Sequence, residues 1–133
     1  MIAADTSTWI AFLQGDGGED SRLLNAALDD CQLLMVPAVL TELLSDPSLS
    51  AEVRETLTLL PLIDLQSGFW ERAGLLRARV LARSCKARLG DALIAQTCVD
   101  RAIPLLTRDC DFRTFAAIAE VDLAVIPPSC GSD

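Results

Sequence analysis

Short apolar runs alternate along this chain with longer stretches that carry apolar residues at helical spacing. Buried strands are predicted at 2–4, 33–36, 62–65, 103–106 and 123–126. Helices are predicted between these runs, at about 7–13, 19–30, 37–46, 50–60, 67–84, 91–100 and 111–119. Strands separated by helices favour parallel βαβ units. The alternation therefore predicts an α/β fold with a central parallel sheet.

The chain has 133 residues and is 51% hydrophobic, enough for one domain with a sizeable core. We expect a single domain over residues 1–133, with a loose tail at 127–133. No apolar stretch approaches the roughly 18 residues needed to cross a bilayer, and Met1 leads into an apolar run without a basic signal region. These features predict a cytoplasmic protein with no membrane partner.

Five cysteines are present, with no C-x-x-C pair and no histidine to complete a zinc site. The simplest interpretation is five reduced thiols in a cytoplasmic protein.

Four acidic residues fall where a parallel α/β chain places functional groups. Asp5 ends the first apolar run, Asp109 lies just past a later one, and Asp91 opens a helical segment. Glu42 interrupts the apolar helix VPAVLTELL, where a charge needs a reason. Ligands of open parallel sheets bind outside the carboxyl ends of the strands. Carboxylates gathered there repel one another unless cations lie between them, so the pattern predicts a Mg²⁺ or Mn²⁺ site.

Each acid also has a simpler interpretation. Asp5 and Asp91 can act as helix caps or favour a helix dipole. Asp109 can shape a turn while Asp111 caps the following helix. Glu42 can lie on an exposed helix face despite its apolar neighbours. One shared site nevertheless explains all four positions more simply than four separate coincidences do.

The net charge of −8 argues against a protein that coats nucleic acid by bulk electrostatics, although it allows local contacts. Six basic residues lie between 72 and 88 without an acidic one: Arg72, Arg77, Arg79, Arg83, Lys86 and Arg88. Two interpretations stay open for this stretch, which leads into Gly90 and Asp91. It is a solvated helix face, the usual fate of such runs, or a ridge that holds phosphates beside the acidic pocket.

The chain resembles PIN-domain ribonucleases, most of all the VapC-type toxins of VapBC toxin–antitoxin pairs. The resemblance rests on four segments in the family's order, ADTSTWI, VPAVLTELL, GDALIAQT and LLTRDCDF, and spans nearly the whole chain. It implies a three-layer α/β/α sandwich around a parallel sheet. It also implies divalent-metal-dependent endonucleolytic cleavage of RNA and inhibition by a cognate antitoxin.

The resemblance also assigns roles to individual residues. The catalytic acids it implies are Asp5, Glu42, Asp91 and Asp109. The metal ligands it implies are Asp5, Asp91 and Asp109, with Asp111 as a further or outer contributor. Supporting hydroxyls are expected from Thr6, Ser7 and Thr107. Asp109 and Asp111 can exchange roles within TRDCDF, and we favour Asp109.

The chemistry of the acids agrees with these roles. Mg²⁺ prefers oxygen ligands and keeps several waters, so carboxylates without histidine suit it. A divalent ion makes its bound water a stronger acid, which supplies a nucleophile for phosphodiester attack without a histidine base. Because the chain has no histidine, a histidine-dependent ribonuclease mechanism is excluded.

Three kinds of macromolecular partner are expected. The first is substrate RNA, with Arg83, Lys86 and Arg88 as candidate phosphate contacts. The second is an antitoxin that places a basic segment near the acids and apolar side chains along nearby helices. Its candidate groove residues are Leu40, Leu43, Leu44, Val53 and Leu57, although leucines in such helices are more often core. The third is a second copy of the chain, because the resemblance implies a homodimer.

Other classes of protein fit the sequence less well. A response-regulator receiver needs an acidic pair after the first strand and a lysine at a late strand end, whereas Asp5 precedes Thr6 and the only lysine is Lys86. A haloacid-dehalogenase-type phosphatase needs D-x-D, which Asp5-Thr6-Ser7 lacks. A non-catalytic interaction module with the PIN fold remains an alternative, although all the expected acids are present.

Overall fold

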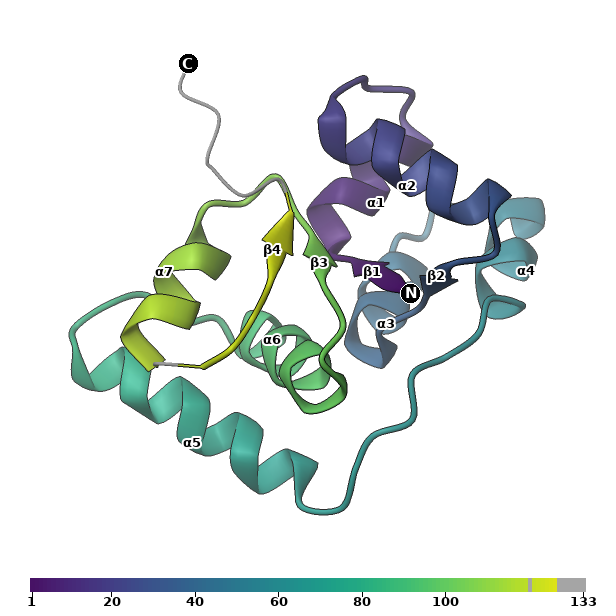
Figure 1. Ribbon diagram of the computed structural model, residues 1–133. Helices are drawn as coiled ribbons and strands as arrows, with labels where there is room; N and C mark the ends of the chain where they lie inside the picture. Colours follow the sequence, from purple (N-terminus) through teal and green to yellow (C-terminus); the bar gives the residue numbers. More distant parts are fainter. Residues whose placement is uncertain (120, 127–133) are drawn as a thin grey trace.

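A parallel four-stranded sheet forms the centre of the protein. The structure, a computed structural model, describes residues 1–119 and 121–126, so the tail predicted at 127–133 lies outside the described residues. The strands are β1 (Ile2–Ala4), β2 (Leu33–Leu34), β3 (Leu105–Leu106) and β4 (Val125–Ile126). Their order is β2-β1-β3-β4, with Ala3 of β1 opposite Leu34 of β2 and Leu105 of β3 (Figure 1).

Helices connect the strands and cover the sheet, which confirms the predicted α/β/α architecture. They are α1 (Thr6–Leu13), α2 (Glu19–Asp29), α3 (Pro37–Leu44), α4 (Ala51–Thr58), α5 (Phe69–Ala82), α6 (Leu89–Arg101) and α7 (Asp111–Ala119). Figure 1 shows α1 and α2 on one side of the strands and α5 on the other. The carboxyl ends of β1 and β3, which are hydrogen-bonded neighbours, therefore lie side by side.

Local sequence signals explain where several helices begin. Asp5 is the N-cap of α1, and its Oδ1 accepts from the backbone N–H of Thr8 over 3.0 Å. Ser50 caps α4, as predicted, by accepting from the N–H of Val53 over 3.1 Å. Pro37 occupies the first position of α3, also as predicted, where its missing N–H costs no hydrogen bond.

The strand predicted at 62–65 is wrong. This segment meets the sheet at a single isolated bridge, between Met35 and Leu62. The Ile63 side chain is buried, whereas Leu62 is 50% exposed. The segment contacts the sheet edge at this one point and then continues toward α5. Composition alone does not distinguish such a segment from a strand.

Two further expectations need correction. Cys31, Cys85 and Cys98 are free thiols, but Cys110 is disulfide-bonded, so the five cysteines are not all reduced. Leu43 and Leu57, proposed as groove residues, are 4% and 2% exposed and belong to the hydrophobic core.

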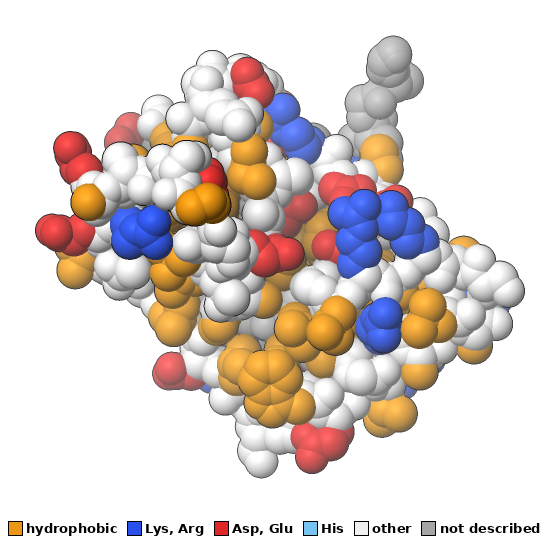
Figure 2. All heavy atoms as spheres, turned by 180° about the vertical axis from the view of Figure 1, so that it is seen from behind, with side chains coloured by type: hydrophobic (Ala, Val, Ile, Leu, Met, Phe, Trp, Pro, Cys, Tyr) orange, Lys and Arg blue, Asp and Glu red, His pale blue; other side chains and the backbone are white. Residues whose placement is uncertain are grey.

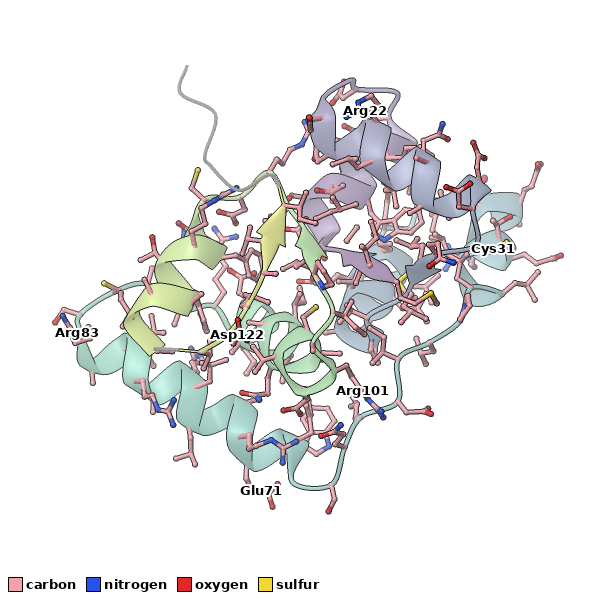
Figure 3. The ribbon with its side chains drawn as sticks, viewed as in Figure 1. Arg22, Cys31, Glu71, Arg83, Arg101 and Asp122 are labelled. Carbon is pink, nitrogen blue, oxygen red and sulfur yellow. The ribbon has the colours of Figure 1, made fainter. Side chains whose placement is uncertain are left out.

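The core lies between the sheet and the helices, where Figure 3 shows the side chains most crowded. Its largest fully buried members include Leu24, Met35, Leu76, Leu105 and Phe112. Charged side chains such as Arg22, Glu71 and Arg83 point outward in the same view. Among the described residues, no helix has the length and apolar character needed to cross a membrane.

Candidate active site

Four acidic side chains from four separate parts of the chain line one cavity of about 260 Å³. Asp5 follows β1 and Asp109 follows β3, so these two come from neighbouring strand ends. Glu42 and Asp91 reach the same cavity from α3 and α6. The other lining residues are Thr6, Ser7, Ile10, Arg88, Gly90 and Ile94. Figure 2 shows acidic side chains around a hollow in one face of the molecule, with basic side chains directly beside it.

Asp5 is the most buried and most firmly held of the four acids. It is 3% exposed. Ser7 Oγ donates to Asp5 Oδ1 over 2.8 Å, and Thr107 Oγ1 donates to Asp5 Oδ2 over 2.6 Å. Because Thr8 N–H also donates to it, Asp5 caps α1 and lines the cavity at once. Asp5 is therefore both the helix cap and a residue of the site, so the two interpretations are compatible.

Thr107 joins the loop that carries Asp109 to the end of β1. Its Oγ1 donates to Asp5 and accepts from the backbone N–H of Asp109 over 2.9 Å. Asp109 Oδ1 in turn accepts from the N–H of Asp111 over 2.9 Å, as in an Asx turn. Asp111 is exposed, does not line the cavity, and faces Lys86 at 3.9 Å. This placement favours Asp109 over Asp111 as the inner acid.

Glu42 lies on an exposed face of α3 but is held at its carboxylate. Thr6 Oγ1 donates to Glu42 Oε1 from the first residue of α1. On its other side, Glu42 Oε2 lies so near Gly90 that a Cβ there would be 2.9 Å from it. Real Cβ atoms essentially never approach an oxygen so closely, so the glycine leaves room for Glu42 at the start of α6.

Asp91 lies in the first turn of α6, whose N-cap is Arg88 rather than Asp91. Burial raises the pKa of Asp91 to about 6, with further increases from the negative charges of Asp109, Glu42 and Asp5. The positive charge of Arg88 acts in the opposite direction. Burial also raises the pKa of Asp5, although hydrogen bonds from Thr107, Thr8 and Ser7 partly oppose that increase. The cavity thus holds more negative charge than its surroundings readily stabilise.

The family of the chain follows from its sequence as a whole. Residues 2–118 match the family model described as the PIN domain. The chain belongs to the PIN-domain family.

Several solved structures share the fold of this chain. A VapBC from Salmonella typhimurium bound to DNA is 21% identical, covers 94% of this chain and 97% of its own, and superposes with a TM-score of 0.69. A toxin–antitoxin complex from Klebsiella pneumoniae is 19% identical, covers 98% and 100%, and has a TM-score of 0.67. VapBC-5 from Mycobacterium tuberculosis is 18% identical, covers 94% and 98%, and has a TM-score of 0.63. No curated protein matches the chain.

The basic residues between 72 and 88 divide into two groups. Three have structural contacts: Arg72 pairs with Asp100, Arg77 donates to the carbonyl of Ala87, and Arg79 donates to the carbonyl of Ala119. Of the three candidate RNA contacts, only Arg88 lines the acidic cavity, whereas Arg83 and Lys86 are exposed outside it. The three basic residues on α5 itself thus contact neighbouring segments, and of the whole run only Arg88 lines the acidic cavity.

Sequence reasoning missed two features of the site. In the sequence Gly90 is only the residue before Asp91, whereas in the structure it leaves room for the Glu42 carboxylate. Arg108, inside the TRDCDF motif, forms a two-pronged ion pair with Asp20, which is 88 positions away. A glycine next to a site acid is a sequence signal for close packing at that point. The Arg108–Asp20 pair leaves no local pattern in the sequence.

The residues that line the cavity fit a hard divalent cation. Asp5, Asp91 and Asp109 offer only oxygen atoms, and no histidine or cysteine lies among the lining residues. Within the described part of the chain, no three acidic or cysteine side chains already stand at metal-binding separations. The oxygen-only donor set is the kind that Mg²⁺ prefers, since this ion also keeps several waters.

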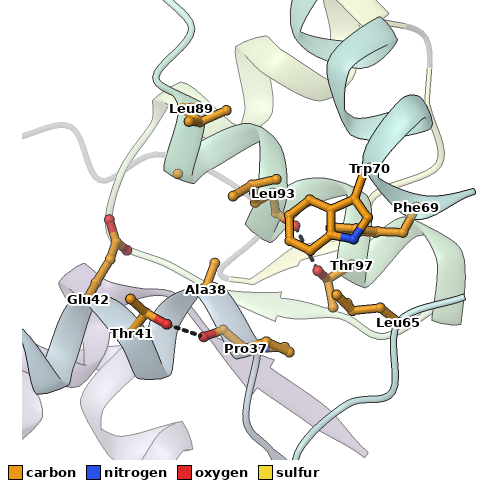
Figure 4. A pocket seen from close by; sticks show the side chains of 11 residues that line it. Pro37, Ala38, Thr41, Glu42, Leu65, Phe69, Trp70, Leu89, Leu93 and Thr97 are labelled. Carbon is orange, nitrogen blue, oxygen red and sulfur yellow. Dashed lines mark hydrogen bonds between the residues drawn. The ribbon is translucent and has the colours of Figure 1, made fainter.

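An apolar cavity of about 300 Å³ adjoins the acidic one and shares Glu42 and Gly90 with it. Figure 4 shows Phe69 and Trp70 of α5 beside Leu93 and Thr97 of α6, with Glu42 at the far end. Trp70 is 65% exposed, so a large aromatic side chain stands open to solvent at the end of this cavity opposite Glu42.

Proposed function

We propose that this PIN domain is a divalent-metal-dependent endoribonuclease and the toxin of a type II toxin–antitoxin pair. The observation that carries the proposal is the meeting of Asp5, Glu42, Asp91 and Asp109 around one cavity. These acids lie at positions that match the family's motifs, and the cavity opens on the surface beside Arg88. The proposed cofactor is Mg²⁺ or Mn²⁺.

The chain's own residues have distinct parts in this reaction. Asp5 stays fixed by three donors, so its two oxygens keep their orientation whether or not a ligand is bound. Burial raises the pKa of Asp91 to about 6, so its carboxylate is mostly ionised at neutral pH and would be available to a cation. A bound divalent ion supplies charge neutralisation at the scissile phosphate and acidifies water. Arg88 adds a positive charge at the cavity wall where the phosphate backbone enters.

Glu42 is the acid best placed to move with substrate, because it is exposed and its only hydrogen-bond donor in the described structure is Thr6. Gly90 leaves it room to approach α6. We assign it to the catalytic set as the acid nearest the surface, oriented by the hydroxyl of Thr6.

The partner we propose is an antitoxin whose basic side chain neutralises the acids. A second cleft of about 310 Å³ continues from the acidic cavity, with Ile10 and Glu42 in both. Its apolar wall includes Leu13, which is 38% exposed. An amphipathic segment can lay apolar side chains in this cleft while an arginine or lysine reaches the acids. Leu40, Leu44 and Val53 are half-buried and remain candidate contacts nearby.

We also propose that the active protein is a homodimer. The apolar face around Trp70 and Leu89, which are 65% and 61% exposed, is the surface we assign to a second copy. The mass of the purified protein in solution tests this assignment. Trp70→Glu should reduce a dimer to monomers, and an unchanged dimer would place the contact elsewhere.

The experiment that tests the activity uses purified, partner-free full-length chain and a mixed pool of cellular RNA. Cleavage is measured with Mg²⁺, Mn²⁺ or EDTA, beside single-stranded DNA of matched composition. We expect cutting of RNA that requires the metal and is lost in Asp5→Asn. Asp29→Asn is the matched control, because Asp29 is exposed at the end of α2, away from the cavity.

Each other result has a definite meaning. Cutting that survives Asp5→Asn shows a contaminating nuclease or a different site. Cutting of DNA but not RNA would show that the substrate is DNA rather than the proposed RNA. A folded protein that cuts neither polymer but binds a basic peptide through the acids would favour a non-catalytic interaction module.

A further inference from the structure

An ion-pair cluster with a buried carboxylate adjoins the residues of the acidic cavity. Arg108 Nε donates to Asp20 Oδ2 over 2.8 Å, and Arg108 Nη2 donates to Asp20 Oδ1 over 2.9 Å. Thr8 Oγ1 donates to the same Asp20 Oδ2 over 2.9 Å. Asp20 is 5% exposed and Thr8 is fully buried. One carboxylate therefore joins α1, the first turn of α2 and the loop between β3 and α7.

A glycine at position 18 leaves room for this cluster. Gly18 has a φ of +143°, and a Cβ there would lie 2.9 Å from Asp20 Oδ1 and 3.1 Å from Arg108 Nη2. The carbonyl of Gly17 accepts from Arg108 Nη2 over 3.4 Å. The glycine-rich turn before α2 thus closes over the guanidinium at a point where a side chain would collide with it.

Two members of the cluster, Arg108 and Thr8, lie within three positions of a site acid in the sequence. Arg108 lies between Thr107, which donates to Asp5, and Asp109, which lines the cavity. Thr8 donates its backbone N–H to Asp5. Neither Arg108 nor Asp20 lines the cavity, so neither is placed to touch a substrate there.

We propose that the Arg108–Asp20–Thr8 cluster is a positioning device that fixes the separation of Asp5 and Asp109 and thereby sets the metal affinity of the site. The proposal rests on the proposed function, because it concerns the same acids. Arg108 anchors the loop of Asp109, Thr8 anchors the helix that Asp5 caps, and Asp20 holds the two together. A two-pronged arginine–carboxylate pair fixes orientation as well as distance, which a lysine does not.

The chain offers a closely matched control pair. Arg72 pairs with Asp100 in the same two-pronged manner, through Nε at 3.2 Å and Nη2 at 2.5 Å. The side-chain exposures are 37% and 6% for Arg108 and Asp20, and 39% and 9% for Arg72 and Asp100. The Arg72 pair joins α5 to α6 and does not border the acidic cavity.

The test compares wild type, Arg108→Lys and Arg72→Lys in full-length protein. Mn²⁺ affinity is measured by calorimetric titration without RNA, and the midpoint of thermal unfolding is measured in EDTA. We expect Arg108→Lys to weaken Mn²⁺ binding by about tenfold, the usual scale for losing a group that orients a metal ligand. Both variants should lower the midpoint of thermal unfolding by similar amounts. Arg72→Lys should nevertheless leave Mn²⁺ affinity within about twofold of wild type.

The outcomes separate this inference from the proposed function. Equal Mn²⁺ affinity in wild type and Arg108→Lys would overturn the positioning role and leave the metal site intact. An equal loss in both variants would show that affinity follows general stability, which also overturns the positioning role. Failure of wild type to bind Mn²⁺ in a saturable way would overturn the metal-dependent function and, with it, this inference.

Discussion

Thr107 donates its hydroxyl to Asp5 across 2.6 Å, although 102 positions separate the two residues in the chain. Both lie at the ends of neighbouring strands, because β1 and β3 are hydrogen-bonded partners in the parallel sheet. The same hydroxyl accepts from the N–H of Asp109. One threonine thus links two of the four site acids, and the sheet order is what brings them together.

Replacing this threonine tests the link. Thr107→Val keeps the shape of the side chain but removes the donor to Asp5 and the acceptor for Asp109. We expect a loss of about 1–3 kcal/mol in the free energy of unfolding, because a buried carboxylate loses a partner. RNA cleavage should fall by about ten- to a hundredfold, as for other groups that orient metal ligands. Urea denaturation and single-turnover cleavage measure the two effects.

Thr97→Val is the control for that experiment. Thr97 is 2% exposed and its hydroxyl donates only to the Leu93 carbonyl inside α6. The substitution should leave cleavage unchanged. If Thr97→Val and Thr107→Val reduce cleavage equally, the hydroxyl of Thr107 has no special part in the site.

Gly90→Ala should displace Glu42. The new Cβ would lie 2.9 Å from Glu42 Oε2, so the carboxylate must turn away. We expect cleavage to fall by about tenfold or more, because small misplacements of catalytic groups are costly. Gly74→Ala in α5 is the control, since nothing lies within 4 Å of its added Cβ. That change should stabilise the protein by about 1 kcal/mol and leave cleavage alone. Full activity in Gly90→Ala would remove Glu42 from the catalytic set.

The raised pKa of Asp91 predicts a specific dependence of stability on pH. Because the folded protein holds this proton up to about pH 6 and the unfolded chain releases it near 3.8, the contribution of Asp91 to metal-free stability falls as pH rises between those values. Asp91→Asn should therefore be more stable than wild type in EDTA at about pH 7, with the difference vanishing near about pH 4. Urea denaturation at both pH values measures it. Adding Mn²⁺ should stabilise wild type more than the variant, and identical pH curves for both proteins would contradict the shift.

Arg88 and Arg83 should differ in their effect on RNA binding. Arg88 lines the acidic cavity, whereas Arg83 is exposed at the end of α5 and points away in Figure 3. Arg88→Gln should weaken RNA binding and reduce the slope of log affinity against log salt by about 0.7, the value for one phosphate contact on single strands. Arg83→Gln should change neither by much. Equal effects would restore the interpretation of the whole run as a phosphate-holding ridge.

The sequence predicted the acids because their positions carry local signals. Asp5 follows an apolar strand, and Glu42 breaks an apolar helix, so each can be recognised without knowledge of distant partners. The alternation of strands and helices then placed them at one edge of a parallel sheet. Asp111 lacked a distinguishing signal beside Asp109, and only the structure separates the inner acid from the exposed one.

The rest depends on tertiary packing that leaves no periodic pattern. The segment 62–65 has the composition of a strand, but it pairs with the sheet at a single bridge, between Leu62 and Met35. Asp20 reads as an ordinary acid in the first turn of a helix, and its burial beneath Arg108 follows from contacts across 88 positions. Side-chain pairs of this kind are set by how elements pack rather than by any spacing in the sequence.

The central claim is that Asp5, Asp91 and Asp109 hold a divalent cation in one cavity. The most direct measurement is anomalous diffraction from crystals of the purified protein soaked in Mn²⁺, beside crystals of Asp5→Asn treated identically. The account predicts an anomalous peak in the cavity between these acids, absent from the variant. Mn²⁺ bound only at other acids, such as the exposed Asp29 and Asp30, or a peak in the cavity that persists in Asp5→Asn, would contradict it.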